Sequence, residues 1–142
     1  LDYGSYERLQ DVLNSDRLIP KLGEFTSVLH FEPDEEYGFI DMSNIREWKY
    51  NARSYSIDHN ELFYNSFDEW DSILSSLCHR KTRKGAYIRE KIFSDFWQEK
   101  VPEIEYSGHW KNKFALAERN EYELDHDGKP ERLVSSFYRR LE

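Results

Sequence analysis

Residues 66–77, SFDEWDSILSSL, carry the strongest local signal in the chain. Ser66 stands three residues before Glu69, which is the spacing of a helix-capping box. Apolar side chains then follow at i, i+3, i+4 and i+7, so they share one face of a helix and predict packing against a core. These side chains are Trp70, Ile73, Leu74 and Leu77.

Three further segments place apolar residues at helical intervals. The pattern predicts helices in residues 5–14, in residues 86–100, which end before Pro102, and in residues 132–141 at the end of the chain. The side chains that define them are Tyr6, Leu9 and Leu13 in the first segment, Ile88, Ile92 and Phe96 in the second, and Leu133, Phe137 and Leu141 in the third.

The other segments alternate between apolar and polar residues, as half-buried strands do. In the first half this pattern predicts an antiparallel meander of four or five strands, and around Gly108 it predicts three more. The expected strands are residues 24–31, 37–42, 44–50, 53–57, 61–67, 103–110, 111–118 and 120–125. The chain is therefore predicted to be one α+β domain over residues 1–142, a mostly antiparallel sheet with two or three amphipathic helices packed on it.

Composition limits the kind of partner. The 142 residues carry 20 Lys and Arg against 28 Asp and Glu, a formal net charge of −8, and 16% of them are aromatic. An acidic surface repels phosphate backbones and disfavours nucleic acid, while aromatic content at this level predicts a folded core. The one strong basic run, residues 79–84, is expected to be a solvated helix end.

Cys78 is the only cysteine, so the chain has no intrachain disulfide. No run of eighteen apolar residues predicts a membrane span, and the expected location is the cytoplasm. The chain begins at Leu1 without a Met, which suggests a trimmed start and keeps open the alternative of an interaction domain from a larger protein.

Residues 36–50, EYGFIDMSNIREWKY, contain a candidate catalytic set. Asp41, Glu47 and Lys49 follow the order Asp, then Glu-x-Lys, in which many Mg²⁺-dependent nucleases hold their metal. If residues 44–50 form a strand, Glu47 and Lys49 share one of its faces. The competing interpretation is a salt-bridged pair at the surface, which is common in a chain that is 34% charged.

Other catalytic and metal motifs are missing from the sequence. Residues 125–128, DHDG, begin like a Ca²⁺ loop, but the later ligands do not follow, so a tight turn is predicted. The five histidines have no metal-ligand spacing, and the sequence holds neither a Gly-x-Ser-x-Gly elbow nor a Gly-rich phosphate loop. We expect no cofactor and no metal, and a binding protein rather than an enzyme.

Exposed acidic and aromatic residues are the natural contacts of such a binder, because rings anchor interfaces and negative charge steers a basic partner. Strands at a sheet edge could also pair with another chain, which leaves a homodimer possible. The candidate partner-binding residues are Asp34, Glu35, Glu36, Tyr37, Asp58, Glu61 and Trp110.

The C-terminal half resembles a known family. Residues 67–77, 85–93, 106–116 and 127–141 follow one another as FDEWDSILSSL, GAYIREKIF, YSGHWKNKFAL and DGKPERLVSSFYRRL. This order is similar to that of the immunity factors that neutralise secreted necrotizing toxins of the NAD⁺-glycohydrolase type and, more broadly, of polymorphic-toxin immunity proteins. The resemblance implies a non-enzymatic α+β protein that occludes the active site of a basic secreted toxin. The alternatives are a Mg²⁺-dependent nuclease and an interaction domain.

Overall fold

The computed structural model describes residues 3–15, 18, 21–31, 36–52, 66–93 and 99–142. Within these residues the chain forms four α-helices, one 3₁₀ helix and four strands. The helices are α1 (Tyr3–Leu13), α2 (Phe25–Phe31), α3 (Ile45–Ala52), α4 (Phe67–Lys81) and the 3₁₀ helix η1 (Ile104–Tyr106). The strands are β1 (Tyr37–Asp41), β2 (Thr82–Phe93), β3 (Phe114–His126) and β4 (Lys129–Arg140).

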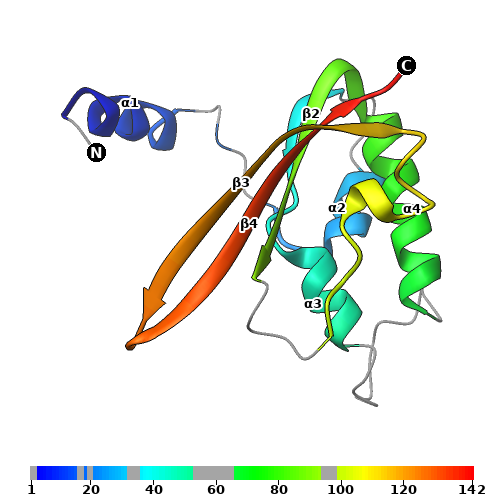
Figure 1. Cartoon of the computed structure of the whole chain (residues 1–142). Helices are drawn as coiled ribbons and strands as arrows, with labels where there is room; N and C mark the ends of the chain where they lie inside the picture. The colour runs from blue at the N-terminus through cyan, green and yellow to red at the C-terminus, as the bar shows by residue number, and fades with distance from the viewer. Residues whose placement is uncertain (1–2, 16–17, 19–20, 32–35, 53–65, 94–98) are drawn as a thin grey trace.

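The four strands form one mixed sheet in the order β1-β2-β4-β3. β1 runs parallel to β2, whereas the β2–β4 and β3–β4 pairs are antiparallel. Figure 1 shows α2, α3 and α4 gathered on one side of this sheet. The α+β class expected from the sequence is therefore confirmed, with a mostly antiparallel sheet.

The predicted helix after Ser66 is confirmed as α4. The Glu69 N–H donates to Ser66 Oγ over 3.1 Å, so the cap forms as its spacing predicted. Trp70, Leu74 and Leu77 are buried along the helix. The basic run of residues 79–84 spans the last turn of α4 and the start of β2, as expected for cations that complement a helix C-terminus.

The two helices predicted in residues 86–100 and 132–141 are wrong, because these segments contain β2 and β4. Spacings of four residues misled the prediction, since four fits both a helical period of 3.6 and a strand period of two. Ile88 and Ile92 do share a buried face, but it is the face of a strand. The turn predicted at residues 125–128 is confirmed: it joins β3 to β4, with positive φ at Asp127 and Gly128.

The predicted N-terminal meander is also wrong. Among the described residues before α4 only β1 is a strand, whereas residues 25–31 and 45–52 form α2 and α3. α2 buries Thr26 and Leu29, three residues apart, because a helix selects that spacing rather than alternation. Residues 53–57 and 61–65 lie outside the described part. In the predicted strand of residues 103–110, η1 and turns are found instead.

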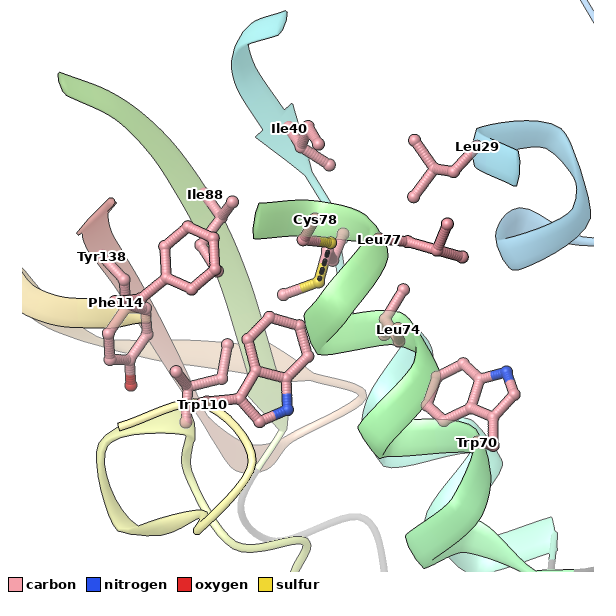
Figure 2. Packing of buried hydrophobic residues seen from close by; sticks show 12 residues of the cluster. Leu29, Ile40, Trp70, Leu74, Leu77, Cys78, Ile88, Trp110, Phe114 and Tyr138 are labelled. Atoms are coloured by element: carbon pink, nitrogen blue, oxygen red, sulfur yellow. Dashed lines mark hydrogen bonds between the residues drawn. The ribbon is translucent and has the colours of Figure 1, made fainter. Parts of the chain in front are cut away.

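The core lies between α4 and the sheet. Figure 2 shows Cys78 of α4 on the side toward Ile88 of β2, Leu77 pointing toward Leu29 of α2, and Trp110 between the helix and the strands. The segment from η1 to β3 thus closes one end of the core. Among the described residues, no helix is long and apolar enough to cross a membrane.

Helix α1 agrees with the helix predicted in residues 5–14, but it does not join this core. None of its residues is buried. Figure 1 shows it standing apart from the sheet and from the other helices.

Candidate functional site

The loop after β1 lies at the carboxyl end of the two parallel strands. Asp41 ends β1 opposite Arg89 of β2. The pairing continues past it, because the Met42 N–H donates to the Arg89 carbonyl at 3.0 Å and the Lys91 N–H donates to the Ser43 carbonyl at 2.8 Å. Ser43 turns the chain with φ of 49°, and its N–H donates to Asp41 Oδ1 at 2.9 Å. The loop is therefore tied to β2 just before α3 begins.

A charged pair marks this edge of the sheet. Arg89 Nη1 lies 3.6 Å from Asp41 Oδ2, and both side chains are partly exposed. The Arg89 Nε donates to Ser135 Oγ at 3.0 Å, and the guanidinium stands over the Phe137 ring. In sheets built from parallel strands, ligands bind outside the carboxyl ends of those strands. The β1–α3 loop is therefore the first place to expect a ligand.

The structure does not gather Asp41, Glu47 and Lys49 into one metal site. Glu47 and Lys49 lie on a helix rather than a strand, so two residues turn them about 200° apart. Glu47 is buried, and both of its carboxylate oxygens accept from the Phe93 N–H, at 3.2 and 3.0 Å. Lys49 instead extends over the Trp70 ring. Their predicted common face is wrong, and Glu47 ties α3 to the end of β2.

A buried ionic cluster lies beneath α3. Arg46 Nε and Nη2 donate to the two oxygens of Asp71 at 2.8 and 3.2 Å, and Nη1 donates to Glu90 Oε2 at 2.6 Å. Nη1 also donates to the Pro102 carbonyl, and the Trp110 Nε1 donates to Asp71 Oδ1 at 2.9 Å. These contacts join α3, α4, β2 and the segment around η1 at one point.

The charges in this cluster are strongly perturbed. Burial raises the pKa of the Glu90 carboxyl against the opposing attraction of Arg46. Burial acts to lower the pKa of Arg46, yet the charges of Glu90 and Asp71 and their hydrogen bonds raise it. Glu90 Oε1 and the Tyr138 hydroxyl are buried without a hydrogen-bond partner in the described structure. The cluster is enclosed, so we assign it to stability rather than to ligand binding.

A groove of about 530 Å³ opens beside α3. This volume is within the range of small-molecule sites. Three aromatic rings and two ammonium groups contribute to its wall. The lining residues are Lys21, Gly23, Glu24, Phe25, Val28, Ile45, Trp48, Lys49 and Trp70. Helix α3 begins directly after the β1 loop, and three of its residues line the groove. The same helix therefore contacts both the groove and the loop at the carboxyl end of β1.

Trp48 and Lys49 bring an exposed aromatic ring and a positive charge to the groove. Trp48 is 54% exposed, a large fraction for an indole ring. The Lys49 ammonium lies 5.7 Å from the centre of the Trp70 ring, within the range of a cation–π contact. Exposed rings beside ammonium groups suit a ligand that has a flat ring and a negative group.

Glu24 fixes one wall of this groove by capping α2. Its Oε2 accepts from the Ser27 N–H at 3.0 Å and from the Thr26 hydroxyl, and the Trp70 Nε1 donates to its Oε1 at 3.5 Å. Burial acts to raise the pKa of Glu24, but these hydrogen bonds outweigh it and lower the pKa. Glu24 is thus a structural carboxylate.

Of the predicted partner-binding residues, the structure describes Glu36, Tyr37 and Trp110. Trp110 is fully buried, so this prediction is corrected: its ring packs in the core and its N–H binds Asp71. Tyr37 packs against the core, whereas Glu36 is exposed beside it. The remaining candidates lie outside the described residues: Asp34, Glu35, Asp58 and Glu61.

Sequence analysis missed the ionic cluster and the groove. Glu90 falls in phase with Ile88 and Ile92, and Asp71 sits beside Trp70 at the start of the helix stripe. A charged residue at a position that the pattern expects to be buried indicates a buried ion pair, because a charge is buried only at high cost without a partner. No local pattern marks the groove, because its lining comes from three separate helices and a loop.

The comparisons with known proteins find a similarity in fold and none in sequence family. No family model and no curated protein matches this chain. Among solved structures it is similar to the N-methyltransferase NodS from Bradyrhizobium japonicum WM9, crystallised in complex with S-adenosyl-l-homocysteine. The TM-score is 0.55 at 10% identity, over 95% of this chain and 62% of the NodS chain. The chain therefore spans less than two thirds of that protein.

Metal ligands do not converge in the part of the chain that the structure describes. There, no three His, Cys, Asp or Glu side chains lie close enough together to hold an ion.

Proposed function

We propose that this chain is a small-molecule-binding domain of the methyltransferase fold, with its ligand in the groove beside α3. The observation that carries the proposal is the likeness to NodS over 95% of the chain. The position of the groove supports it, since α3 starts at the carboxyl edge of the parallel strands, where such folds bind ligands.

S-adenosyl-l-homocysteine, the compound bound to NodS, is the first ligand class to consider. The groove has side chains that suit it: Trp48 could stack on an adenine ring, and Lys21 and Lys49 bring positive charge for a carboxylate. Stacking of a base on an aromatic side chain contributes about 1–3 kcal/mol. A charge-assisted hydrogen bond contributes about 1.5–3 kcal/mol.

Calorimetric titration of the chain with S-adenosyl-l-homocysteine tests this proposal. We expect saturable binding that Trp48→Ala weakens roughly tenfold or more, because a stacking contact is lost. Tyr106→Ala is the matched control, since Tyr106 is an exposed ring outside the groove. Absence of binding, or equal weakening by both substitutions, would contradict the proposal.

Titration with adenosine distinguishes the contribution of the adenine ring from that of the amino-acid part of the ligand. It keeps the ring but lacks the amino-acid carboxylate, so Lys49→Gln should weaken binding of S-adenosyl-l-homocysteine and leave adenosine binding unchanged. If Lys49→Gln weakens both equally, the lysine does not bind the carboxylate, and that assignment is wrong.

The toxin inhibitor remains a second candidate, and one surface favours it. Tyr106 is 75% exposed at the end of η1, next to Glu105 and near Glu103. Burial, together with the charge of Glu103, raises the pKa of Glu105. An exposed ring among carboxylates is the kind of anchor that an acidic inhibitor presents to a basic protein.

Co-expression with a basic toxin encoded beside this chain tests the second candidate. An inhibitor acting in the cytoplasm should protect the cells, and Tyr106→Ala should reduce that protection whereas Trp48→Ala should not. A chain that protects cells against no neighbouring toxin would remove this candidate. The two proposals thus predict opposite results for the same pair of variants.

A further inference from the structure

Positive charge gathers at one end of the sheet, although the chain as a whole has a formal net charge of −8. Helix α4 ends at Lys81, and β2 begins at the next residue. The end of β4 lies beside them, because the ring nitrogen Nε2 of His79 is 3.2 Å from the carbonyl oxygen of Leu141. Figure 1 shows these ends of α4, β2 and β4 together near the C-terminus. We call their exposed cations the basic end; they are Arg80, Arg83, Lys84 and Arg139.

The cations of the basic end have no acidic partner in the part of the chain that the structure describes. Ion pairs in that part involve His109 and other arginines, which are Arg46, Arg89, Arg119 and Arg132. The Arg139 guanidinium lies 3.9 Å from the position of a Cβ on Gly85, next to Lys84, and the Arg83 guanidinium lies against Gly38 of β1. The cations therefore extend across the three neighbouring strands β1, β2 and β4.

Few carboxylates accompany these cations. Among the described residues, this end of the sheet has Glu36 directly before β1 and Glu142 shortly after β4. Lys81 and Arg140 add positive charge beside the basic end, and the Arg140 Nε is buried without a hydrogen-bond partner in the described structure. Three acidic residues that precede Glu36 lie outside the described residues: Glu32, Asp34 and Glu35.

The opposite end of the same sheet is acidic. There the turn that joins β3 to β4 carries Lys129 among four exposed or half-buried carboxylates, which are Glu123, Asp125, Asp127 and Glu131. Charge is therefore segregated along the sheet, and the net charge of −8 does not describe the basic end.

Two exposed aromatic rings adjoin the basic end. Ile40 and Ile88 belong to the core, so Phe39 and Tyr87, which alternate with them, point to the opposite face of the sheet. Tyr87 is the register partner of both Phe39 and Arg139, which places the two rings on neighbouring strands beside an arginine. Tyr87 is 40% exposed and Phe39 is 46% exposed.

The same face is mixed in charge farther along the strands. Asp41 pairs with Arg89 there, and Glu118 of β3 lies opposite Phe137. These carboxylates limit the positive surface to the end of the strands at which the basic end lies.

We propose that the basic end, together with the rings of Tyr87 and Phe39, binds a single-stranded nucleic acid, independently of the ligand in the groove. The cations contact phosphates, and the exposed rings offer surfaces on which unpaired bases stack. Bases in a duplex are already stacked on one another, so a duplex does not use the rings. An anionic membrane surface would likewise use the cations alone. The rings thus favour a nucleic-acid strand over both alternatives.

Fluorescence anisotropy of a labelled oligodeoxythymidylate of about 20 nucleotides tests this proposal, because the probe forms no duplex and exceeds the site size of a small domain. We expect saturable binding at low salt. If each of the four cations contacts a phosphate, an increase in salt from about 50 to about 200 mM should weaken binding roughly fiftyfold. Tyr87→Ala should weaken binding about fivefold or more, because a stacking contact is lost.

Lys84→Glu and Lys129→Glu are a matched pair of variants, since both replace an exposed lysine of a strand and change the net charge equally. Lys84→Glu removes a phosphate contact and should weaken binding roughly eightfold at about 50 mM salt. Lys129 is at the other end of β4, about 33 Å from Arg139 along the strand, where salt screens its charge. Lys129→Glu should therefore change the affinity less than about twofold. Circular dichroism checks folding, and Arg139→Gln takes the place of Lys84→Glu if that variant is unfolded.

The proposal is overturned if the probe does not bind at about 50 mM salt, if both lysine variants weaken binding equally, or if Tyr87→Ala has no effect. A duplex of the same length and vesicles that contain phosphatidylserine are the competing probes. We expect both to bind more weakly than the single strand and to be insensitive to Tyr87→Ala. Equal or tighter binding of the duplex or of the vesicles would show that the basic end recognises that partner instead.

Discussion

Arg46 of α3 binds both carboxylate oxygens of Asp71 of α4 in the interior, at 2.8 and 3.2 Å, and neither side chain is more than 2% exposed. This fork-like contact joins two successive helices, through residues that are 25 positions apart in the sequence. Its strength depends on complete pairing, because burial removes the water that would otherwise solvate the charges. The same guanidinium also neutralises Glu90 on β2.

Replacement of Arg46 by Met should destabilise the fold by about 3–5 kcal/mol, since it leaves Asp71 and Glu90 as buried, uncompensated carboxylates. Urea unfolding followed by tryptophan fluorescence measures this. Arg89→Met is the control: it also removes an Arg–Asp pair, but a partly exposed one, and should cost about 1 kcal/mol or less. Equal losses in the two variants would show that the buried cluster does not stabilise the fold as its geometry indicates.

Glu90 should make stability depend on pH. Burial raises its folded-state pKa above the ordinary value of 4.5. The folded state therefore holds the proton more tightly than the unfolded state does, so this stabilising contribution is complete below pH 4.5 and is lost as the pH rises through the folded-state pKa. Glu90→Gln removes the titration. We expect the unfolding free energy of the natural chain to fall relative to that of Glu90→Gln as the pH is raised from 4 to 8. A difference that stays constant or changes in the opposite direction would contradict this assignment.

Cys78 should be unreactive in the folded chain. Its thiol is fully buried on α4, its sulfur lies 4.0 Å from that of Met42, and burial raises its pKa. Labelling by a thiol reagent at neutral pH should proceed only as fast as the protein opens, and urea should accelerate it greatly. A Cys78→Ala, Ser76→Cys variant is the control, because residue 76 is exposed on the same helix and should react at once. Equal rates at the two positions would mean that residue 78 is accessible.

Ser43→Gly should stabilise the protein by up to about 1 kcal/mol. Ser43 has φ of 49°, a left-handed conformation that costs residues with a Cβ roughly 1–2 kcal/mol, and glycine avoids much of that cost. The backbone bond from Lys91 to its carbonyl remains in the variant. In contrast, Ser76→Gly within α4 should destabilise by about 1 kcal/mol. Thermal unfolding of both variants checks the opposite signs.

Local chemistry in the sequence was sufficient for α4 and for the β3–β4 turn. The Ser66 cap and the stripe through Trp70 and Leu77 involve neighbours within two turns of helix, so they form from local interactions. The Asp127-Gly128 turn is likewise specified by two residues that tolerate positive φ. That pair also favours a hairpin, a signal that outweighs the four-residue spacing of Leu133 and Phe137.

The conformation of the other segments, and the contacts between elements, were decided only by the tertiary structure. Ile88 and Ile92 fit both a helix and a strand, and pairing of β2 with β1 and β4 selected the strand. The spacing of Glu47 and Lys49 suits a metal site on a strand, but both residues lie on α3, and a helix directs them to different sides. The groove and the Arg46 cluster combine residues from several elements, and no local pattern encodes such proximity. The sequence by itself determined the elements whose stabilising contacts are local, whereas burial of long-range partners determined the alternative that each ambiguous segment adopts.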